Sequence, residues 1–264
     1  MARRRGKRKQ KSREEYVLKE KKKIGDVVTD ERTLQNLRKF FSNGLVSEVS
    51  FLIATGKEAD VYVAKSGDAL DERFIALKIF RIETSSFAKR IDYITGDPRF
   101  GKIKNDLYNM AMVWCKKEYG NLRIAHDAGV AVPRPYGFKG NMLCMEFIGD
   151  EDGVPAKRLK DTPVDDPERV LSKIISDVKK LNKSNLVHAD LSEYNVLMKG
   201  QEPYLIDLGQ AVMLGHPKYH EFMERDVINI LYYFRRRYGI EMDHERVLEE
   251  IMAEQAQKRR NPKI

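Results

Sequence analysis

The sequence predicts an α+β fold of two lobes, in which an antiparallel sheet dominates the N-terminal lobe and helices dominate a reduced C-terminal lobe. Strand-like runs separated by turn residues fill the first half of the chain, and longer runs with apolar residues at helical spacing fill the second half. The length of 264 residues is sufficient for two closely coupled lobes, each with its own apolar core.

The first half opens with a helix and a small sheet. Asp30 to Gly44 has an acidic start, several apolar residues on one face and a glycine at its end, which is typical of an amphipathic helix. Strand-like segments follow over Glu48 to Ala54, Val61 to Lys65 and Arg73 to Arg81. We expect these segments to pair as antiparallel strands.

An insertion, a second helix and two more strands complete the first half. Residues 84–106 lack periodicity and mix small, glycine, proline and charged residues, so we expect a mobile insertion. Asn109 to Ala128 carries an apolar stripe that predicts a helix. Two strands then meet across the turn Lys139 to Asn141 and end over Met145 to Ile148. A polar connector over residues 149–153 leads into the second lobe.

Helices dominate the second half. Apolar residues recur at helical spacing in a segment that Pro167 opens and that ends near residues 182–185. Two short strands, Val196 to Lys199 and Pro203 to Ile206, follow around a glycine turn, and helices are predicted over His220 to Tyr238 and His244 to Gln257.

The excess positive charge is confined to the N-terminal tail. Residues 1–23 contain 12 Lys or Arg and 3 Asp or Glu, whereas the rest of the chain contains 37 residues of each sign. Such a segment buries too little apolar surface to order itself, and its cations would release counterions from a phosphodiester backbone. We therefore predict a disordered basic tail that acts either as an RNA-binding arm or only as a solubilising segment.

The sequence gives no sign of a membrane or secreted protein. No run approaches the roughly 18 apolar residues of a membrane span, and no apolar stretch of a signal peptide follows the basic N-terminus. Cys115 and Cys144 each lie in an apolar run, which favours two buried reduced thiols over a zinc site or a disulfide framework. These features predict a cytoplasmic protein without a membrane partner.

The strongest chemical motif runs from Leu186 to Asn195 and is followed by Asp207. Phosphoryl transfer needs neutralisation of the triphosphate and a group beside the attacking hydroxyl, because the protein contributes mainly positioning and electrostatics. Asp190 offers a carboxylate for the acceptor proton, and Asn195 and Asp207 offer oxygens for Mg²⁺, a hard cation. Each residue alone would be an ordinary turn residue, but the set predicts a phosphotransferase. His188 is assigned a scaffold role.

Lys78 is a second anchor, because it interrupts an otherwise apolar strand and shares a face with apolar residues. An ammonium group there is costly unless an anion meets it, and a triphosphate and a carboxylate are the natural partners. Glu118 lies on the apolar face of the following helix and is the expected carboxylate. The alternatives are a lysine that reaches solvent from an edge strand and a plain solvated helix over Lys116 to Glu118.

The loop that covers the phosphates is predicted between the first two strands. The sequence there reads Thr55, Gly56, Lys57, Glu58, Ala59 and, two residues on, Val61. Gly56 allows close approach of the backbone, and Thr55 and Lys57 are placed to contact phosphate oxygens. This is not a Walker A loop, and a bare hairpin turn would have a similar sequence.

Together these motifs resemble those of the RIO family of atypical serine/threonine protein kinases, and in particular its Rio-one branch. Thr55 to Ala59 resembles the short phosphate loop of that branch, His188 to Asn195 its catalytic loop, and Ile206 to Gln210 its metal-binding loop. The resemblance covers about residues 30–255. It implies a bilobal protein-kinase-like fold, with residues 24–148 as an extension helix and nucleotide-binding lobe and residues 149–264 as a catalytic lobe.

The resemblance also implies roles for individual residues, with Asp190 as the catalytic aspartate and a hinge that binds adenine. The implied catalytic residues are Lys78, Asp190 and Asp207; the metal ligands are Asn195 and Asp207; and the nucleotide contacts are Thr55, Gly56, Lys57, Glu58, Ala59, Val61, Lys78, Glu118 and, in the hinge, Met145, Glu146 and Ile148. A transient phosphate on Asp207 is a further hypothesis that the resemblance brings.

The implied cofactors are ATP and Mg²⁺, with Mn²⁺ as an alternative cation. The implied role is maturation of the small ribosomal subunit, either as a protein kinase or as an ATPase, and the partners would be the preribosomal small subunit and its RNA. Neither the protein substrate nor the oligomeric state follows from the sequence.

The sequence also departs from ordinary protein kinases. The phosphate loop has one glycine, no Phe follows Asp207, no Ala-Pro-Glu segment occurs downstream, and only 57 residues remain after Asp207. A conventional peptide groove is therefore not expected. Two other functions fit the motifs: a small-molecule phosphotransferase that resembles aminoglycoside or choline kinases, and a nucleotide-gated RNA-binding scaffold.

Overall fold

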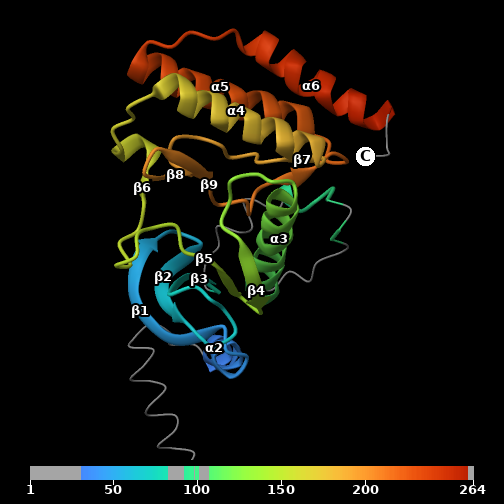
Figure 1. Ribbon diagram of the computed structural model, residues 1–264. Coiled ribbons are helices and arrows are strands. Elements are labelled where there is room, and N and C mark those ends of the chain that lie inside the picture. The colour runs from blue at the N-terminus through green and yellow to red at the C-terminus, as the bar shows by residue number, and fades with distance from the viewer. Residues whose placement is uncertain (1–30, 83–91, 98, 101–106, 261–264) are drawn as a thin grey trace, which may run out of the picture.

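A computed structural model of the protein describes residues 31–82, 92–97, 99–100 and 107–260. The helices α4, α5 and α6 are stacked at one end of the molecule, the five-stranded sheet lies at the other end, and α3 runs between the two (Figure 1). The predicted tail over residues 1–23 lies outside the described residues, as does most of the predicted insertion. The predicted two-lobed α+β architecture is confirmed.

The N-terminal lobe is one antiparallel sheet with the strand order β1-β2-β3-β5-β4. Its strands are β1 (Val46–Thr55), β2 (Ala59–Ser66), β3 (Phe74–Phe80), β4 (Pro135–Lys139) and β5 (Met142–Glu146). Two helices accompany them, α2 (Glu31–Ser42) and α3 (Leu107–Asp127). Each predicted strand therefore exists, and the differences lie in where the strands begin and end.

The central strand β3 separates two apolar cores. Ile75, Leu77 and Ile79 pack with the buried face of α2, whereas Phe80 belongs to the large core that α3 shares with the C-terminal lobe. A strand that is buried on both faces reads as a continuous apolar run, and this explains the composition of β3. Lys78 also lies in this buried strand, at 8% exposure.

The C-terminal lobe contains α4 (Pro167–Lys183), α5 (Tyr219–Tyr238) and α6 (His244–Arg260). The carboxylate of Asp166 accepts a hydrogen bond from the backbone N–H of Arg169 at 3.0 Å and caps α4, with Pro167 as the first helical residue. Gly239 ends α5 in the left-handed conformation, at φ 73°. Local capping signals thus account for the start of α4 and the end of α5.

Short β-pairings complete this lobe. The strands β6 (Lys157–Arg158), β8 (Val196–Lys199) and β9 (Glu202–Leu205) form one sheet, and β7 (Leu186–Val187) pairs with β10 (Val212–Met213). A short 3₁₀ turn, Leu159–Asp161, follows β6. The sequence did not predict the two-residue strands β6, β7 and β10, because two residues carry no periodicity.

The described part of the predicted insertion packs on the C-terminal lobe. The ring of Tyr93 stacks on Phe222 of α5 at 5.1 Å between centroids, and Ile94 is buried. Nε2 of His216 lies 2.8 Å from the carbonyl oxygen of Asp92. This packing joins the segment before α3 to the start of α5 and was not predicted from the sequence.

Cys115 and Cys144 are both buried free thiols, as predicted. Burial raises the pKa of each thiol, that of Cys144 to about 12. Among the helices of the described residues, none combines the length and the apolar character that crossing a membrane requires.

Candidate active site

A cleft of about 700 Å³ lies between the sheet and the loops of the C-terminal lobe. Every residue that the sequence assigned to the site lines it. These residues are Thr55, Gly56, Lys57, Glu58, Ala59, Val61, Lys78, Glu118, Met145, Glu146, Ile148, Asp190, Asn195 and Asp207. Segments that are more than 100 residues apart in the sequence therefore meet around one cavity that is large enough for a nucleotide.

Lys78 is the charged centre of the cleft. Its Nζ donates to both carboxylate oxygens of Glu118, at 2.8 and 2.7 Å, and to Oδ1 of Asp207, at 2.9 Å. Lys78 and Glu118 are buried, whereas the side chain of Asp207 is 47% exposed toward the cleft. The anionic partners that a lysine in an apolar strand requires are thus present, and they come from α3 and the loop after β9.

Burial and the charge of the partner shift the pKa of each residue of this pair in opposite directions. Burial lowers the pKa of Lys78, but the carboxylates of Asp207 and Glu118 outweigh this effect and raise the pKa above its ordinary value. Burial raises the pKa of Glu118 to about 7, and the ammonium group of Lys78 opposes that rise. Lys78 is therefore a permanent cation that is available to an incoming phosphate.

Asp190 is held by two amide side chains. Nδ2 of Asn195 donates to the carbonyl oxygen of Asp190 at 2.7 Å and lies 3.3 Å from its Oδ2. Nε2 of Gln210 donates to the same Oδ2 at 2.9 Å. The carboxylate of Asp190 thus has a fixed orientation at the edge of the cleft, as a proton acceptor beside a reacting hydroxyl requires.

The loop that carries Asp190 is anchored from behind by α5. The buried carboxylate of Asp226 accepts hydrogen bonds from the backbone N–H groups of Ala189 and Leu191, at 2.7 and 2.9 Å. Ala189 has a left-handed backbone, with φ 64°, which is uncommon for a residue other than glycine. Burial raises the pKa of Asp226 to about 6, against the opposing effects of the nearby His188 and of the two N–H donors.

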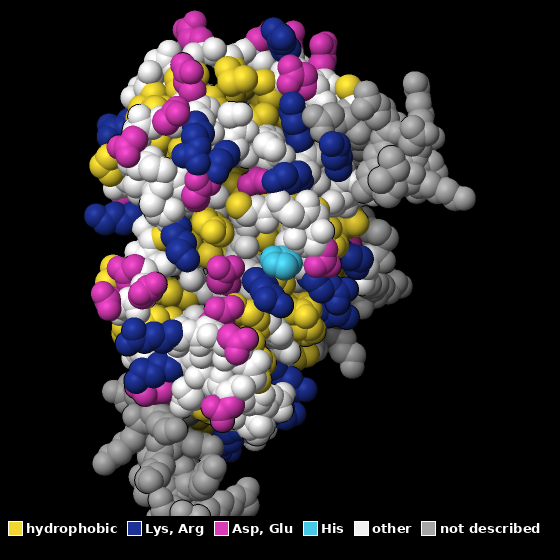
Figure 2. All heavy atoms as spheres, in the orientation of Figure 1, with side chains coloured by type: hydrophobic (Ala, Val, Ile, Leu, Met, Phe, Trp, Pro, Cys, Tyr) yellow, Lys and Arg dark blue, Asp and Glu magenta, His cyan; other side chains and the backbone are white. Residues whose placement is uncertain are grey.

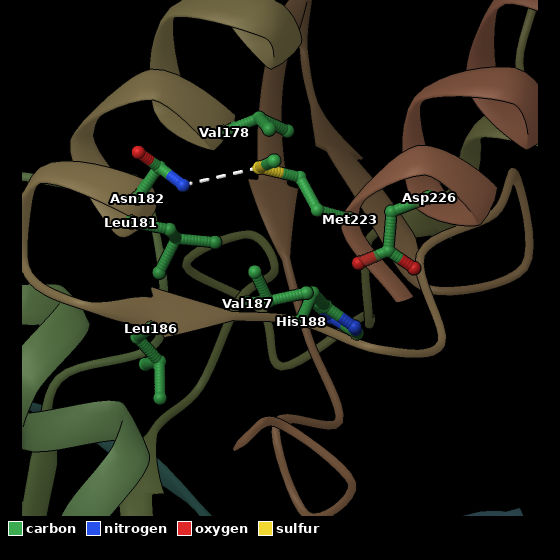
Figure 3. A pocket seen from close by; sticks show the side chains of 8 residues that line it. All are labelled: Val178, Leu181, Asn182, Leu186, Val187, His188, Met223 and Asp226. Carbon is green, nitrogen blue, oxygen red and sulfur yellow. Dashed lines mark hydrogen bonds between the residues drawn. The ribbon is translucent and has the colours of Figure 1, made fainter. Parts of the chain in front are cut away.

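His188 has the scaffold role that the sequence predicted. Its Nε2 lies 3.0 Å from the carbonyl oxygen of Ile206, so the ring ties the catalytic loop to the residue before Asp207. His188 and Asp226 lie close to one another at the wall of a cavity of about 10 Å³ behind the loop (Figure 3). This cavity has room for about one water molecule.

The loop between β1 and β2 is held by a compact hydrogen-bond network. Oγ1 of Thr55 donates to Asp60 at 2.6 Å, and Arg81 donates to Asp60 through Nε and Nη2, at 3.0 and 2.7 Å. Nη2 of Arg81 also donates to Thr55 at 2.8 Å. Burial raises the pKa of Asp60, but the hydrogen bonds from Arg81 and Thr55 outweigh it and lower the pKa. The network defines the shape of the turn that carries Gly56 and Lys57.

The hinge differs in part from the prediction. The strand that was expected to run through Ile148 ends at Glu146, because Phe147 and Ile148 leave the sheet and Gly149 forms an isolated bridge with Pro155. Met145, Glu146, Phe147 and Ile148 nevertheless all line the cleft. The connector therefore begins earlier than the sequence indicated, and its residues still border the cavity.

The structure rules out one alternative interpretation of the segment Lys116 to Glu118. A solvated helix was one alternative there, but Lys117 is fully buried and Glu118 is 1% exposed. Only Lys116 of the three faces solvent. Burial lowers the pKa of Lys117 to about 7, and the charge of Asp97 opposes this shift. Two adjacent buried ionisable residues on a helix next to the cleft are an unusual concentration of polar groups in a protein core.

Sequence reasoning missed Gln210, Asp226, Lys117 and Asn121 as contributors to the site. The sequence offers one weak signal for three of them, since Lys117 and Asn121 recur at helical spacing with Trp114, and Asp226 interrupts an apolar face of α5. Their partners are backbone groups of distant loops, and only the folded chain brings these together.

The donor set of the cleft fits a magnesium ion. Asn195 and Asp207 line the cleft and provide amide and carboxylate oxygens. The described residues contain no cluster of three or more His, Cys, Asp or Glu side chains suited to a metal. A site of one or two side chains completed by phosphate oxygens and water is the arrangement that Mg²⁺ prefers, whereas a site built entirely from protein ligands suits other cations.

Most of this site lies within one recognised protein domain. The model of the RIO domain family matches residues 60–247, which include Lys78, the catalytic loop and the metal-binding loop. The chain belongs to the RIO family. The predicted family and the predicted class of enzyme, an atypical serine/threonine protein kinase, are both confirmed.

Several curated RIO relatives are similar over most of their length. The RIO-type serine/threonine-protein kinase Rio1 of Haloferax volcanii is 37% identical, over 89% of this chain and 79% of the relative. The protein of the same name from Thermoplasma acidophilum is 41% identical, over 72% of this chain and 98% of the relative. The similarity to proteins named Rio1 agrees with the predicted branch of the RIO family.

Solved RIO structures share the fold. The crystal structure of the Rio2 kinase from Chaetomium thermophilum aligns with a TM-score of 0.63 at 18% identity, over 89% of this chain and 78% of that chain. Its ADP/Mg²⁺-phosphoaspartate complex aligns with a TM-score of 0.62 at 20% identity, over 88% and 71%. The bilobal kinase-like architecture predicted for this RIO protein is confirmed at the level of the fold.

Proposed function

We propose that this RIO protein is a Mg²⁺-dependent protein kinase that transfers the terminal phosphoryl group of ATP to a serine or threonine hydroxyl, with Asp190 as the catalytic aspartate. The observation that carries this proposal is the convergence of Lys78, Asp190, Asn195 and Asp207 on one cleft. Positioning and electrostatics are what phosphoryl transfer requires of a protein, and these four side chains supply both.

ATP would enter with its adenine against the hinge and its phosphates under the β1–β2 loop. Met145 and Ile148 offer apolar contacts, and the adjacent backbone offers hydrogen-bonding groups. The ammonium group of Lys78 would move its contact from Asp207 to the phosphates, since Glu118 holds it from the opposite side. Nucleotide binding thereby frees the carboxylate of Asp207 to face the metal.

In the transfer step, the acceptor oxygen forms a bond to the γ-phosphorus while the bond from phosphorus to the ADP oxygen breaks. The hydroxyl proton passes to the carboxylate of Asp190, whose orientation Gln210 and Asn195 fix. Asn195 and Asp207 would hold the metal, and Mg²⁺ when bound neutralises charge on the phosphates.

Replacing Asp190 by Ala tests the proposal. We expect turnover of ATP and transfer to a generic protein acceptor to fall at least about 100-fold, because the proton acceptor is removed, while the affinity for ADP changes less than about 2-fold. Initial rates with radiolabelled ATP and calorimetric titration with ADP measure the two effects. A variant that transfers phosphate at the parent rate would remove Asp190 from the mechanism.

ATP hydrolysis through Asp207 is a second candidate activity, and the exposure of this carboxylate to the cleft favours it. A relative's structure is named as an ADP/Mg²⁺-phosphoaspartate complex. In this route an oxygen of Asp207 bonds to the γ-phosphorus as ADP leaves, and water then releases inorganic phosphate and a proton. Label that hydroxylamine removes from the protein would support this route, whereas acid-stable label on serine alone would contradict it.

We also propose that the protein acts on a precursor of the small ribosomal subunit and contacts its RNA. The support is the family assignment together with the net charge of +9 within residues 1–23. On the face shown in Figure 2, basic and acidic side chains interleave, so this face offers no basic surface that would replace the tail. The cytoplasmic location expected from the sequence remains a prediction.

A small-molecule kinase is the competing function. After Asp207, the described residues form β10, α5 and α6. A screen of amino-alcohol and aminoglycoside acceptors for stoichiometric release of ADP distinguishes the two functions. Release that depends on one such acceptor would replace the protein-kinase proposal.

A further inference from the structure

The loop that follows Asp207 is fastened to α3 by two buried polar side chains. Nζ of Lys117 donates to the carbonyl oxygen of Gly209 at 2.9 Å and also donates to the carbonyl oxygen of Ala211. Nδ2 of Asn121 donates to the carbonyl oxygen of Leu208 at 2.7 Å and to that of Ala211 at 3.0 Å. Three of the four carbonyl groups over residues 208–211 are thus bound by α3.

These two side chains sit where apolar residues would be expected. Both are fully buried, and they lie on the face of α3 that also carries Trp114, Glu118 and Leu122, at intervals of three and four residues. An amine or amide in such a core is costly unless its hydrogen bonds are satisfied, and here carbonyl groups of the loop accept from the N–H donors of both side chains. The bonds of Lys117 do not require its charge, because a neutral amine still has two N–H donors.

The loop lies directly against this helix face. A Cβ atom added to Gly209 would be 3.3 Å from Oε2 of Glu118 and 3.7 Å from Oδ1 of Asp207. Asp207 itself has φ 62°, a strained conformation for a residue other than glycine that persists only where its surroundings enforce it. On the C-terminal side of Asp207, the carbonyl oxygen of Leu208 accepts hydrogen bonds from Asn121 and from the backbone N–H of Ala211.

We propose that Lys117 and Asn121 are positioning residues of the transfer site: they fix the backbone of residues 208–211, so that Asp207 faces the nucleotide and Gln210 reaches Asp190. The inference rests on the proposed function, because it assigns the geometry of the same site to α3. Glu118 anchors Lys78 from the same helix, so α3 holds both the phosphate-binding lysine and the metal-binding loop.

The test compares ADP affinity with and without Mg²⁺ by calorimetry in Lys117→Met and Asn121→Ala. Since the adenine contacts are distant from the loop, we expect ADP affinity in EDTA to stay within about 2-fold of the parent protein. We expect the gain in affinity on adding Mg²⁺ to shrink by about 10-fold, because each variant lacks two hydrogen bonds that hold the metal-binding loop. Asn121→Ala keeps both bonds from Lys117, so it tests the inference even if Lys117→Met does not fold.

Asn141→Ala is the matched control. Asn141 is equally buried and also makes two side-chain donations, to Oγ1 of Thr33 at 2.9 Å and to the carbonyl oxygen of Phe80 at 2.8 Å. We expect it to lower Tm without changing the gain from Mg²⁺. Folded variants at Lys117 or Asn121 that keep the full gain would overturn the positioning role. A parent protein that gains no affinity from Mg²⁺ would instead overturn the proposed function.

Discussion

At the scale of single residues, two non-glycine residues with left-handed backbones lie in the loops of the candidate site. Ala189, which precedes Asp190, has φ 64°, and Asp207 has φ 62°. Each such conformation costs on the order of 1–3 kcal/mol and is retained where surrounding contacts outweigh the strain. Asp226 supplies these contacts for the catalytic loop through two backbone N–H groups. The conformation of the loop that carries Asp190 is therefore maintained by a residue that does not line the cleft.

Gln210 is the residue whose replacement should separate catalysis from binding. Gln210→Leu removes the donor to Oδ2 of Asp190, and we expect kcat to fall by about 10-fold or more while KM for ATP changes little. Steady-state kinetics over a range of ATP concentrations measures both constants. Gln201→Ala is the control, because Gln201 lies on the β8–β9 turn and does not line the cleft. Its side chain accepts a hydrogen bond from the backbone N–H of Asp165. Equal kcat values for Gln210→Leu and the parent would contradict the role of Gln210.

Asp226 makes stability depend on pH in a defined direction. Its pKa in the folded protein is raised to about 6 from 3.8, so the folded state holds a proton that the unfolded state releases between these values. Its stabilising contribution is present below about pH 3.8 and is lost as the pH rises through about 6. We therefore expect the stability difference between the parent and Asp226→Asn to fall by on the order of 2–3 kcal/mol over this range.

Urea denaturation of both proteins at half-unit steps from about pH 4 to about pH 8 measures this difference. Other carboxylates cancel in the comparison, because both proteins carry them. A difference that is flat across the range, or that grows with pH, would show that the pKa of Asp226 is not raised.

At the scale of elements, α3 and the β1–β2 hairpin position the groups that would contact the phosphates in the proposed function. The face of α3 carries the carboxylate that anchors Lys78 and the two donors that hold the metal-binding loop. The hairpin carries the loop between β1 and β2. The side chain of Arg81, which follows β3, donates hydrogen bonds to Asp60 and Thr55 on either side of this loop. Residues of both the sheet and the helix therefore line one cleft.

Arg81→Ala should loosen the phosphate loop without unfolding the lobe. We expect KM for ATP to rise by about 3- to 10-fold, because Thr55 and Asp60 no longer share a donor, while Tm falls only slightly, as exposed ion pairs are worth about 0–1 kcal/mol. Lys65→Ala is the matched control, since it breaks an exposed ion pair with Glu48, at 3.0 Å, at the other end of the same hairpin. An equal rise in KM in both variants would argue against a specific role for the network.

At the scale of the whole molecule, charge is divided between a basic tail and a balanced body. Residues 1–23 carry a net charge of +9, and the remaining residues are neutral overall. Binding to RNA through such a tail is largely electrostatic and depends steeply on salt. The body contains the cleft, and in the proposed function the basic residues 1–23 would keep the protein close to a large anionic partner.

Deletion of residues 1–23 should weaken the binding of a single-stranded RNA oligomer. We expect the plot of log affinity against log salt to become shallower by about 0.7 for each phosphate that the tail neutralises in the parent protein. Fluorescence anisotropy at salt concentrations from about 50 to about 200 mM measures this slope. A variant with the same tail residues in shuffled order is the control and should bind like the parent. An unchanged slope after deletion would assign RNA binding to another surface.

The predictable part of the site was the part that local sequence encodes. The catalytic loop from His188 to Asn195, the metal-binding loop and the short phosphate loop are contiguous motifs, so their residue types and spacing could be recognised directly. Lys78 stood out because a charge in an apolar strand needs an anion. Glu118 was the expected partner, and its two contacts with Lys78 agree with that expectation.

The contributions of Lys117, Asn121, Gln210 and Asp226 could not be predicted in this way. Each binds a backbone or side-chain group that is between 20 and 94 residues distant in the sequence. A polar residue on an apolar helix face shows only that a partner is needed, and the identity of that partner depends on how the elements pack. The packing of residues 92–97 on α5 was missed for the same reason.

The amino-acid sequence alone was therefore sufficient to predict the two-lobed α+β fold, the RIO motifs and many of the residues that line the cleft, because hydrophobic periodicity, capping and contiguous motifs are local properties of the chain. Which distant groups hold those residues in place became known only from the packed molecule. Buried hydrogen bonds such as those from α3 to the loop after Asp207 depend on the relative placement of elements, and no local pattern encodes that placement.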